Sequence, residues 1–329
     1  MNSFGRIFRV SIFGESHGAG AGIVIDGCPP GIPVTDDDFE KDLARRRSGA
    51  DGTTPRKESD IPEVISGFFN GRTTGAPVAI IFRNSDTRSS DYSKFRAMPR
   101  PGHADFTSNL KYKGYNDMRG SGHFSGRITV GLVAAGVIAK KIIKDTDISA
   151  ELVEAGGSRD IKKAVSEAAS DNDSVGGIIE CRIRNMTQGL GEPFFDSFES
   201  VLAHIIFAVP GVRGLEFGSG FKAASMRGSE HNDNFISFNG KTETNNHAGI
   251  NGGITNGNEI FFRLAMKPTS SIAKTQITFN MEKKEMGELK AEGRHDTSFA
   301  LRVPPVIEAA AAIAAADLFL INRIYQDIQ

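Results

Sequence analysis

The sequence has little of three features that would each assign it to a specialised class of protein. Its only cysteines, Cys28 and Cys181, stand far apart without partners at metal-ligand spacing, which gives no support for structural zinc and fits a reducing compartment. The 39 lysines and arginines balance 40 aspartates and glutamates, so the net charge of -1 does not indicate a nucleic-acid or membrane surface. We therefore expect no bound metal and no nucleic-acid partner.

Long apolar runs are also scarce. The most apolar segment, residues 306–321, is interrupted by Glu308 and Asp317 and is shorter than the roughly 20 residues that a membrane span needs, so it predicts a buried helix. The first residues lack a charged stretch followed by an apolar one, which is the pattern of a secretion signal. We therefore expect a cytoplasmic protein with no membrane partner.

What the sequence does contain is a mixture of helical and strand patterns. A threonine followed three positions later by an acidic residue, and a basic end, predict a helix over residues 35–47. Apolar periodicity predicts further helices at 127–144, at 197–207 and from 305, and strands at 6–13, 61–69, 77–82, 175–183 and 259–266. Because helix and strand do not alternate steadily and no low-complexity linker divides them, we predict one α+β domain over residues 1–329.

Residues 14–18, Gly-Glu-Ser-His-Gly, match the Gly-x-Ser-x-Gly pattern of serine hydrolases. That pattern needs a helix directly after the serine, whereas residues 18–26 have alternate glycines followed by Ile-Val-Ile, which predicts a loop entering a second strand. If extended, Ser16 and His17 would point to opposite faces and could not act as nucleophile and base. The glycine spacing also misses the dinucleotide-binding pattern. His17 is therefore a better candidate for chemistry than Ser16.

Two polar loops have both a chemical and a structural interpretation. Prolines and a glycine make residues 99–105 a rigid loop that presents His103 beside Asp105, as a general acid requires, although a loop histidine is often only solvated. Residues 119–127 precede a predicted helix, where backbone N–H groups can bind an anion or can simply form a capped turn.

Three further clusters also have both a chemical and a structural interpretation, and for residues 267–271 and 45–47 the structural one is the default. The cation and three hydroxyls of residues 267–271 suit a phosphate group or an ordinary turn. Residues 293–296, Gly-Arg-His-Asp, suit proton handling or a surface ion pair. The arginines at 45–47 suit a polyanion, or serve only as a favourable cationic helix end.

Six motifs follow one another along nearly the whole chain: FGESHG at 13–18, DLARRR at 42–47, RPGHAD at 100–105, NHAG at 246–249, KPTSS at 267–271 and GRHD at 293–296. Together they closely resemble the chorismate synthase family. The resemblance implies an enzyme that eliminates phosphate and a C6 hydrogen from 5-enolpyruvylshikimate 3-phosphate in the anti-1,4 sense, giving chorismate, the last common step of aromatic amino-acid biosynthesis. It also implies reduced FMN as cofactor, a β-α-β sandwich with helices between two antiparallel sheets, and a homotetramer.

The resemblance further implies roles for individual residues. His17 would lie at the substrate phosphate, His103 at the flavin, and Asp296 would help to draw a proton from flavin N5. Further substrate contacts would come from Arg45, Arg46 and Arg127. FMN would be held by His123, Phe124, Ser125, Pro210, Gly211, Gly252, Lys267, Pro268, Thr269, Ser270, Ser271 and Arg294. Whether the enzyme reduces its own flavin with NADPH stays open, and a separate flavin reductase is the favoured partner.

Three positions depart from the family pattern. His123 stands where an arginine is usual, so a permanently charged donor becomes one whose charge depends on pH. Residues 48–52 offer no further arginine after Arg47, which leaves Arg56 as the nearest cation. Thr297 replaces a proline, for which we expect a small effect. A serine hydrolase and a non-catalytic anion-binding scaffold are the alternative functions.

Overall fold

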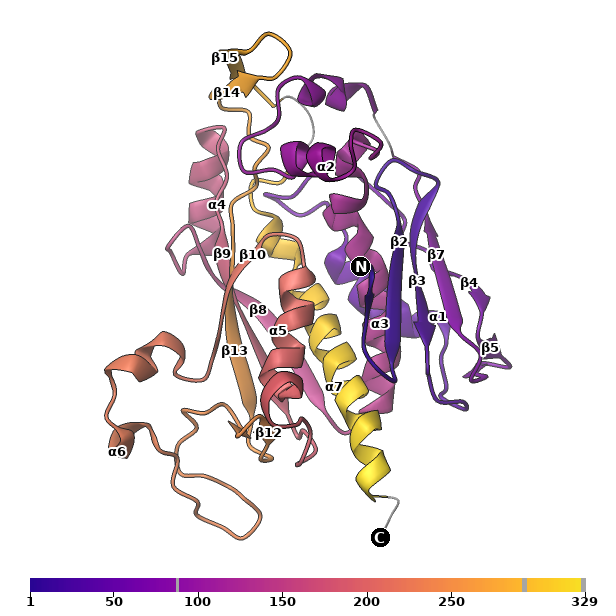
Figure 1. The fold of residues 1–329 in the computed structure, drawn as a ribbon, viewed down its shortest axis with the longest axis vertical. Helices are drawn as coiled ribbons and strands as arrows, with labels where there is room; N and C mark the ends of the chain where they lie inside the picture. The colour runs from indigo at the N-terminus through magenta and orange to yellow at the C-terminus, as the bar shows by residue number, and fades with distance from the viewer. Residues whose placement is uncertain (87–88, 292–294, 327–329) are drawn as a thin grey trace.

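Two antiparallel sheets enclose a layer of helices in the computed structural model, which describes residues 1–86, 89–291 and 295–326 (Figure 1). One sheet has the order β1-β2-β3-β7-β4, made of Ser3–Phe4, Arg9–Gly14, Gly20–Asp26, Val78–Arg83 and Glu63–Ser66. The other has the order β10-β13-β9-β8, made of Val212–Phe217, Ile260–Met266, Gly177–Arg184 and Asp147–Ala155. The predicted α+β sandwich is therefore confirmed.

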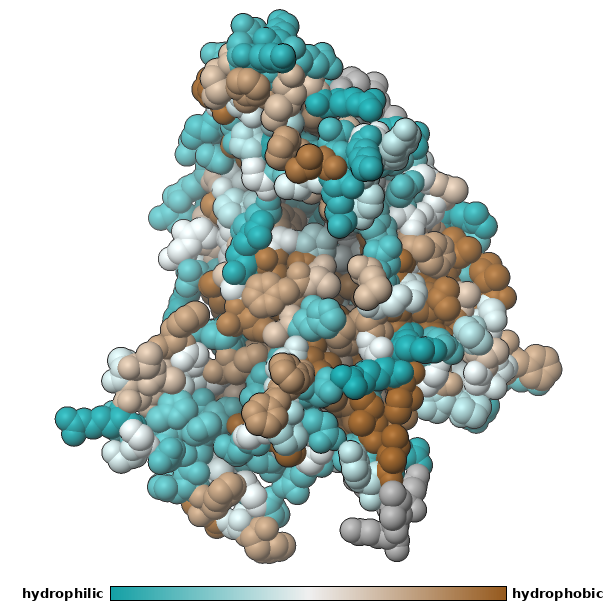
Figure 2. All heavy atoms as spheres, viewed as in Figure 1, coloured by the Kyte–Doolittle hydropathy of each residue, from teal (hydrophilic) through white to brown (hydrophobic). Residues whose placement is uncertain are grey.

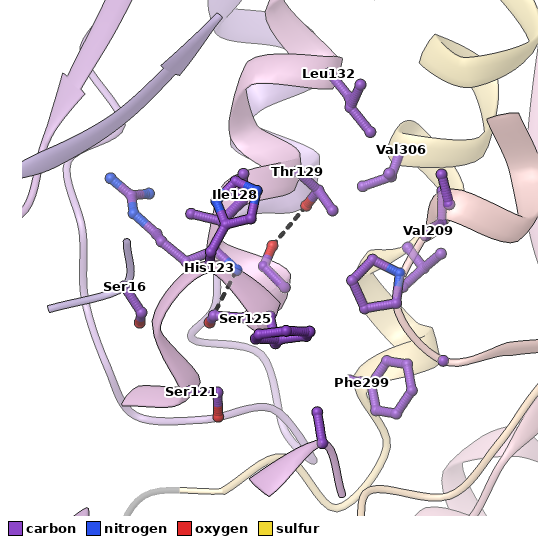
Figure 3. A pocket seen from close by; sticks show the side chains of 18 of the residues that line it. Ser16, Ser121, His123, Ser125, Ile128, Thr129, Leu132, Val209, Phe299 and Val306 are labelled. Atoms are coloured by element: carbon purple, nitrogen blue, oxygen red, sulfur yellow. Dashed lines mark hydrogen bonds between the residues drawn. The ribbon is translucent and has the colours of Figure 1, made fainter. Parts of the chain in front are cut away.

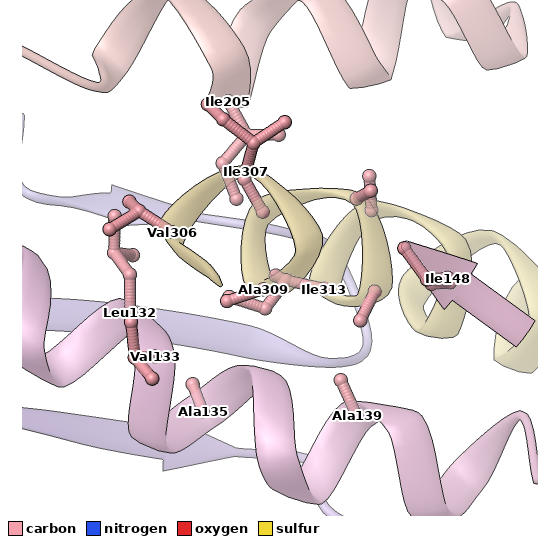
Figure 4. Close-up of a cluster of buried hydrophobic side chains, with 14 of the residues drawn as sticks. Leu132, Val133, Ala135, Ala139, Ile148, Ile205, Val306, Ile307, Ala309 and Ile313 are labelled. Carbon is pink, nitrogen blue, oxygen red and sulfur yellow. The ribbon is translucent and has the colours of Figure 1, made fainter. Parts of the chain in front are cut away.

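Between the sheets lie α1 (Asp36–Arg46), α3 (Thr129–Ile142), α5 (Phe198–Ala208) and α7 (Pro304–Gln326). Helix α3 packs on β3 and β7, α7 packs on β8 and β9, and the two helices pack on each other. Figure 4 shows this contact, where side chains of both helices meet Ile205 of α5 and Ile148 of β8. One continuous hydrophobic cluster thus joins both sheets.

The α3–α7 crossing depends on small residues. A Cβ atom added to Gly136 of α3 would lie 2.5 Å from Ala309 Cα in α7, closer than any real contact. Helix α7 also has small side chains where it faces α3. Its alanines at 309–312 are all at most 1% exposed. The backbones can therefore approach each other closely, which places the first turns of both helices at the cavity described below.

By length and composition, α7 could cross a membrane over Pro304–Tyr325, but 89% of its apolar window is buried inside the protein. Its acidic side chains are also satisfied within the fold. Asp317 accepts hydrogen bonds from the backbone N–H groups of residues 6–8 at 2.7–3.0 Å. These properties identify α7 as a core helix, as the sequence predicted.

Most predicted elements occur with shifts of one to two residues. The acidic residue predicted to cap α1, Asp38, accepts a hydrogen bond from the Thr35 backbone N–H at 2.7 Å. The strand predicted over 61–69 is instead divided at Gly67 into β4 and β5 (Phe68–Phe69), and β5 pairs with β6 (Arg72–Thr73). Sequence patterns did not reveal β8, β10, α2 (Asp105–Lys111), α4 (Ile161–Ser170), α6 (Gly228–His231), β11 (Ile250–Asn251), β12 (Ile254–Thr255), β14 (Gln276–Asn280) or β15 (Glu285–Leu289).

A small subassembly covers one end of the sandwich (Figure 1). The β14–β15 hairpin packs on the 3-10 segment Ser89–Arg96 through a separate apolar cluster of Phe95, Leu289 and Ala291. Hydrogen bonds from the Met281 N–H to the Ala97 carbonyl and from Thr278 Oγ1 to the Pro99 carbonyl fasten the hairpin to the 97–101 loop. This loop leads directly into the polar residues of the cavity.

Candidate functional site

A cavity of about 950 Å³ lies where these elements meet. Its walls come from the ends of α1, α3 and α7, the α5–β10 connection, and the loops around residues 100–104, 119–127 and 267–271. In Figure 3, Ser16, Ser121 and His123 lie on one side of the opening, and Val209, Val306 and Phe299 on the other. Most of the predicted site residues, which are scattered through the sequence, therefore come together here.

The described residues that line the cavity carry a large excess of positive charge. Eight are arginine or lysine, whereas three are carboxylates. The cations are Arg46, Arg47, Arg56, Arg100, Arg127, Arg213, Lys267 and Arg302, and the carboxylates are Glu58, Asp60 and Asp296. Because such charges interact more strongly where water is scarce, the site suits a ligand that carries several negative groups.

Arg46 and Arg127 share one buried carboxylate. Asp60, whose side chain is 1% exposed, accepts from Arg46 Nη1 at 2.9 Å and also pairs with Arg127 Nη1. Arg46 donates further to the carbonyls of Gly126 and of Arg127 at 3.2 and 3.0 Å, and burial lowers its pKa against the opposing effect of Asp60. Both guanidinium groups are therefore fixed in place, with one negative charge between two positive ones.

The Gly-Glu-Ser-His-Gly segment is a turn that leads directly from β2 into β3, without the helix of a nucleophile elbow. Ser16 is 1% exposed, and its Oγ accepts a hydrogen bond from Arg56 Nη1 at 2.7 Å. Arg56 also contacts the Ser16 carbonyl at 2.9 Å and Glu58 at 2.6 Å. Arg56, the nearest cation after residues 48–52, thus reaches the cavity, and Ser16 is held as a hydrogen-bond acceptor.

His17 is 8% exposed and lies behind two lining residues, Gly120 and Tyr92. Its ring meets Tyr92 edge to face, with centroids 5.2 Å apart. Gly120 has a positive φ of 58°, and a Cβ atom there would collide with the His17 ring, so this position requires glycine. The 119–124 turn therefore packs directly against His17.

His103 belongs to a buried polar cluster. Its Nδ1 lies 2.7 Å from Asp105 Oδ1, and its Nε2 lies 3.1 Å from Ser121 Oγ. Arg100 binds both oxygens of Asp105 at 2.8 Å and Ser271 Oγ at 2.8 Å. Burial lowers the pKa of His103, and hydrogen bonds from Arg100 and His103 hold the pKa of Asp105 well below its usual range despite its burial.

Asp296 lines the cavity from the segment before α7. Arg302 donates to its two oxygens at 3.1 and 2.8 Å, and the Thr54 backbone N–H donates at 2.9 Å. The Asp296 side chain is 12% exposed. Its three hydrogen bonds therefore hold the carboxylate in a fixed position at the cavity wall.

The loop after β13 carries the predicted cation and hydroxyls. Lys267 Nζ contacts Ser270 Oγ at 2.6 Å and the Gly102 carbonyl, and burial lowers its pKa, with Arg213 and Arg100 adding repulsion. Thr269 Oγ1 is buried and has no hydrogen-bond partner among the described residues. A buried hydroxyl in this state is suited to a ligand that enters the cavity.

Part of the cavity wall is apolar. It is formed by Phe4, Val10, Ile12, Phe124, Ile128, Leu132, Ile205, Val209, Pro210, Phe299 and Val306. Gly211 completes this wall at a positive φ of 97°, where a Cβ atom would collide with the Phe299 ring. The site therefore joins a cation-rich region to an apolar one of the kind that accepts a flat aromatic ring.

His123 takes part in the wall through hydrogen bonds within the protein. Its Nδ1 donates to the Gly14 carbonyl at 2.8 Å, and its Nε2 lies 3.2 Å from Asn2 Oδ1. Ser125 follows it and accepts from the Arg127 N–H at 3.2 Å. His123 thus ties the 119–124 turn to the first strands.

Not every predicted residue lies at the cavity. Arg45 points away from it and forms a two-fold ion pair with Glu308 at 2.7 and 2.8 Å, so its predicted substrate contact is not supported by this geometry. Gly252 lies in the β11–β12 turn, and neither it nor Pro268 lines the cavity. Arg294 lies outside the described residues.

Sequence reasoning missed several lining residues. Asp60, Glu58 and Arg302 have no signal in the sequence beyond their charge. Arg100 belongs to the motif at 100–105, whose pattern points to His103 as the chemical group and gives no separate sign that Arg100 lines the cavity. In residues 1–86, 89–291 and 295–326, no group of three or more histidine, cysteine or acidic side chains is placed to hold a metal ion.

Comparisons with known proteins agree on one family. The model of the family described as chorismate synthase matches residues 8–320. The chain is 55% identical over 332 residues to the chorismate synthase of Chitinophaga pinensis, covering 99% of this chain and 100% of that protein. It is 43% identical to the chorismate synthase of Pyrococcus abyssi, with 98% of each covered. A crystal structure of chorismate synthase has the same fold, with a TM-score of 0.75, 23% identity and 98% coverage of both chains.

Proposed function

The chain belongs to the chorismate synthase family and is a carbon–oxygen lyase acting on a phosphate ester, and we propose that the 950 Å³ cavity is its active site. The family reaction removes phosphate and a C6 hydrogen from 5-enolpyruvylshikimate 3-phosphate and forms chorismate. The observation that carries this proposal is the meeting of eight cationic side chains with an apolar wall in one cavity.

The cation-rich part fits the substrate, which has two carboxylates and a phosphate. Arg46 and Arg127 carry one positive charge in excess of Asp60, and their buried positions are fixed before a ligand arrives. Arg56 adds a further cation from another wall. Preorganised charges of this kind stabilise a leaving phosphate without rearrangement during the reaction.

We assign His17 to the departing phosphate, as general acid or as electrostatic partner. Its neighbour in sequence, Ser16, lines the cavity and accepts a hydrogen bond from Arg56, which supports this role. A histidine is suited to such a role because its ordinary pKa of about 6.5 allows proton transfer near neutral pH. The packing against Tyr92 holds its ring in one orientation.

The apolar wall fits the ring system of reduced FMN, with His103 and Asp296 at its edge. When bound, reduced FMN supplies an electron-rich centre that permits the elimination without net oxidation. Lys267, Ser270 and the buried hydroxyl of Thr269 are placed to receive polar groups of the cofactor, and Phe124 and Phe299 are placed to contact its ring. Asp296, anchored by Arg302, would help to move the flavin N5 proton.

Assembly and redox supply complete the proposal. Exposed aromatic side chains outside the cavity, including Phe194 at 87% and Phe195 at 91%, support a homotetramer. Figure 2 shows hydrophobic atoms across the middle of the viewed face, bordered by hydrophilic ones. In such an assembly the predicted flavin contact of Gly252 would come from another copy.

We further propose a single-domain cytoplasmic enzyme whose flavin is reduced by a separate, NADPH-dependent reductase.

The direct test is anaerobic incubation of the purified protein with chemically reduced FMN and 5-enolpyruvylshikimate 3-phosphate. Phosphate and chorismate should appear in equal amounts, and oxidised FMN should give neither. Folded protein that binds both ligands without turnover would instead support the anion-binding scaffold. Labelling of Ser16 by a fluorophosphonate would support the hydrolase. We expect no labelling, because Ser16 Oγ already accepts a hydrogen bond from Arg56.

A further inference from the structure

The side-chain amide of Asn84 bonds two separate parts of the site at once. Its Nδ2 donates to the carbonyls of Glu15 and Gly18 at 2.9 Å each, and its Oδ1 accepts from Arg127 Nε at 3.0 Å. A carbonyl oxygen can only accept a hydrogen bond and a guanidinium group can only donate one, so these partners fix the orientation of the amide. Asn84 therefore connects the turn at residues 15–18 directly to Arg127.

The backbone of Asn84 is held in place as well. Asn84 follows β7 directly, where Arg83 pairs with Gly20 of β3, and its own N–H donates to the Ala19 carbonyl at 3.2 Å. The contact between the two strands thus continues for one residue beyond β7. The side chain of Asn84 therefore starts from a fixed point beside the turn.

Arg127 is bonded at two different nitrogen atoms of its guanidinium group. Its Nη1 pairs with Asp60, its Nε donates to Asn84, and its side chain is only 5% exposed. Because a guanidinium group is planar and rigid, partners at two of its nitrogen atoms fix both its position and its plane. Asn84 and Asp60 therefore orient this cation together.

Asn84 can act on a ligand only through these partners. Ser16 of the turn lines the cavity (Figure 3), and so does Arg127, whereas Asn84 is not among the described residues of the cavity wall. A displacement of about 1 Å in the groups that hold a reacting ligand can cost roughly 100-fold in rate. The rate should therefore depend on the spacing between the turn and Arg127.

We propose that Asn84 is a positioning residue that fixes the spacing between the 15–18 turn and Arg127. The proposal deepens and rests on the function proposed above, in which His17 of the turn meets the departing phosphate and Arg127 binds a negative group of the substrate. Loss of the Asn84 amide removes no cation from the cavity. It should therefore disturb the placement of the substrate more than its binding.

Hydrogen exchange of the ligand-free protein, followed by mass spectrometry, tests the connection itself. In Asn84→Ala, peptides that cover residues 14–20 should exchange about fivefold faster, as expected for the loss of one neutral hydrogen bond. Thr73→Val is the matched control, because the Thr73 hydroxyl holds a backbone turn at residues 29–32, outside the cavity. This control should leave the exchange of residues 14–20 unchanged. Unchanged exchange there in Asn84→Ala would overturn the proposal.

Steady-state kinetics test the consequence for the reaction. Asn84→Ala should lower kcat about 10- to 100-fold and leave KM within about threefold, because every cation of the cavity is still present. Thr73→Val should keep both constants. A residue that only stabilises the fold would lower the thermal midpoint without changing kcat of the folded enzyme, so an unchanged kcat in Asn84→Ala would refute the positioning role.

Asn84→Asp separates the two contacts of the amide. Its carboxylate still accepts from Arg127 Nε, but it places an oxygen instead of N–H groups against the carbonyls of Glu15 and Gly18. We expect kcat to fall as in Asn84→Ala, and KM to rise because the new carboxylate offsets the charge of Arg127. Full kcat in Asn84→Asp would mean that the turn contact has no role, against the proposal. If one of the two variants does not fold, the other decides.

If the unmodified protein fails to form chorismate with reduced FMN, the proposed function fails, whereas hydrogen exchange still measures whether Asn84 holds the turn. The two proposals therefore have separate outcomes.

Discussion

Asp60→Asn changes the one carboxylate that holds Arg46 and Arg127 together. The variant keeps nearly the same shape, and asparagine tolerates the positive φ of 50° at this position. It removes a charge that is shared by two guanidinium groups whose side chains are each 5% exposed. Two buried positive charges would then lie side by side without their counter-ion.

Removing one partner of a buried ion pair costs about 3–5 kcal/mol. Here the carbonyls of Gly126 and Arg127 still accept hydrogen bonds from Arg46, and Asn84 Oδ1 still accepts from Arg127 Nε at 3.0 Å. These remaining partners place the expected loss of unfolding free energy at the lower end, at about 3 kcal/mol. This loss corresponds to a change of roughly 150-fold in the folding equilibrium.

Glu63→Gln is the matched control, because it also changes a carboxylate on an arginine to an amide. Glu63 pairs with Arg83 on the surface, where the side chains are 43% and 61% exposed. Loss of such a pair should cost less than about 1 kcal/mol. The difference between the two variants therefore isolates the effect of burial.

Urea unfolding followed by circular dichroism measures both variants, since the chain contains no tryptophan as a fluorescent probe. Added inorganic phosphate should stabilise Asp60→Asn more than the unmodified protein, because the anion replaces the missing charge in the folded state only. Stability within 1 kcal/mol of the unmodified protein, with no greater response to phosphate, would refute the idea that Asp60 balances the two arginines.

Three other predictions test separate parts of the structure. Because burial lowers the pKa of His103 below the ordinary value of about 6.5, the unfolded chain binds more protons near that pH. Stability should therefore fall as the pH drops through 6.5. Between pH 7.5 and 5.5, urea titrations should show a smaller loss of unfolding free energy for His103→Gln than for the unmodified protein. An equal loss in both proteins would contradict the lowered pKa of His103. Gly136→Ala should destabilise the protein by about 1–3 kcal/mol through collision with Ala309, although alanine favours helices. A gain in its thermal midpoint would exclude the close helix crossing. Arg56→Ala should lower kcat/KM about tenfold or more through loss of a charged hydrogen bond, whereas Arg45→Ala should leave it within twofold. Steady-state kinetics measure both variants. Equal losses of kcat/KM would contradict the placement of Arg56 inside the active site and of Arg45 outside it.

The local patterns of the chain are sufficient for several features. The threonine and acidic residue at the start of α1, the apolar length of α7 and the glycines after Ser16 each act within a few residues, so their structures follow from nearby sequence. The ordered motifs were sufficient for the family. Edge features such as β8 and β10 escaped prediction because strands without clear alternation depend on their partners for stability.

Only the tertiary structure decided which charges form the site. Arg45 and Arg46 are neighbours in sequence, but about 100° of helical rotation separates them, so one meets Glu308 and the other meets Asp60 in the cavity. Asp60 and Arg302 became site residues because distant segments pack beside them, which no local pattern records. The sequence thus identified the chemistry through its residue types and motifs. Folding assigned the role of each charge, because the energy of a charged group depends on burial and on partners far along the chain.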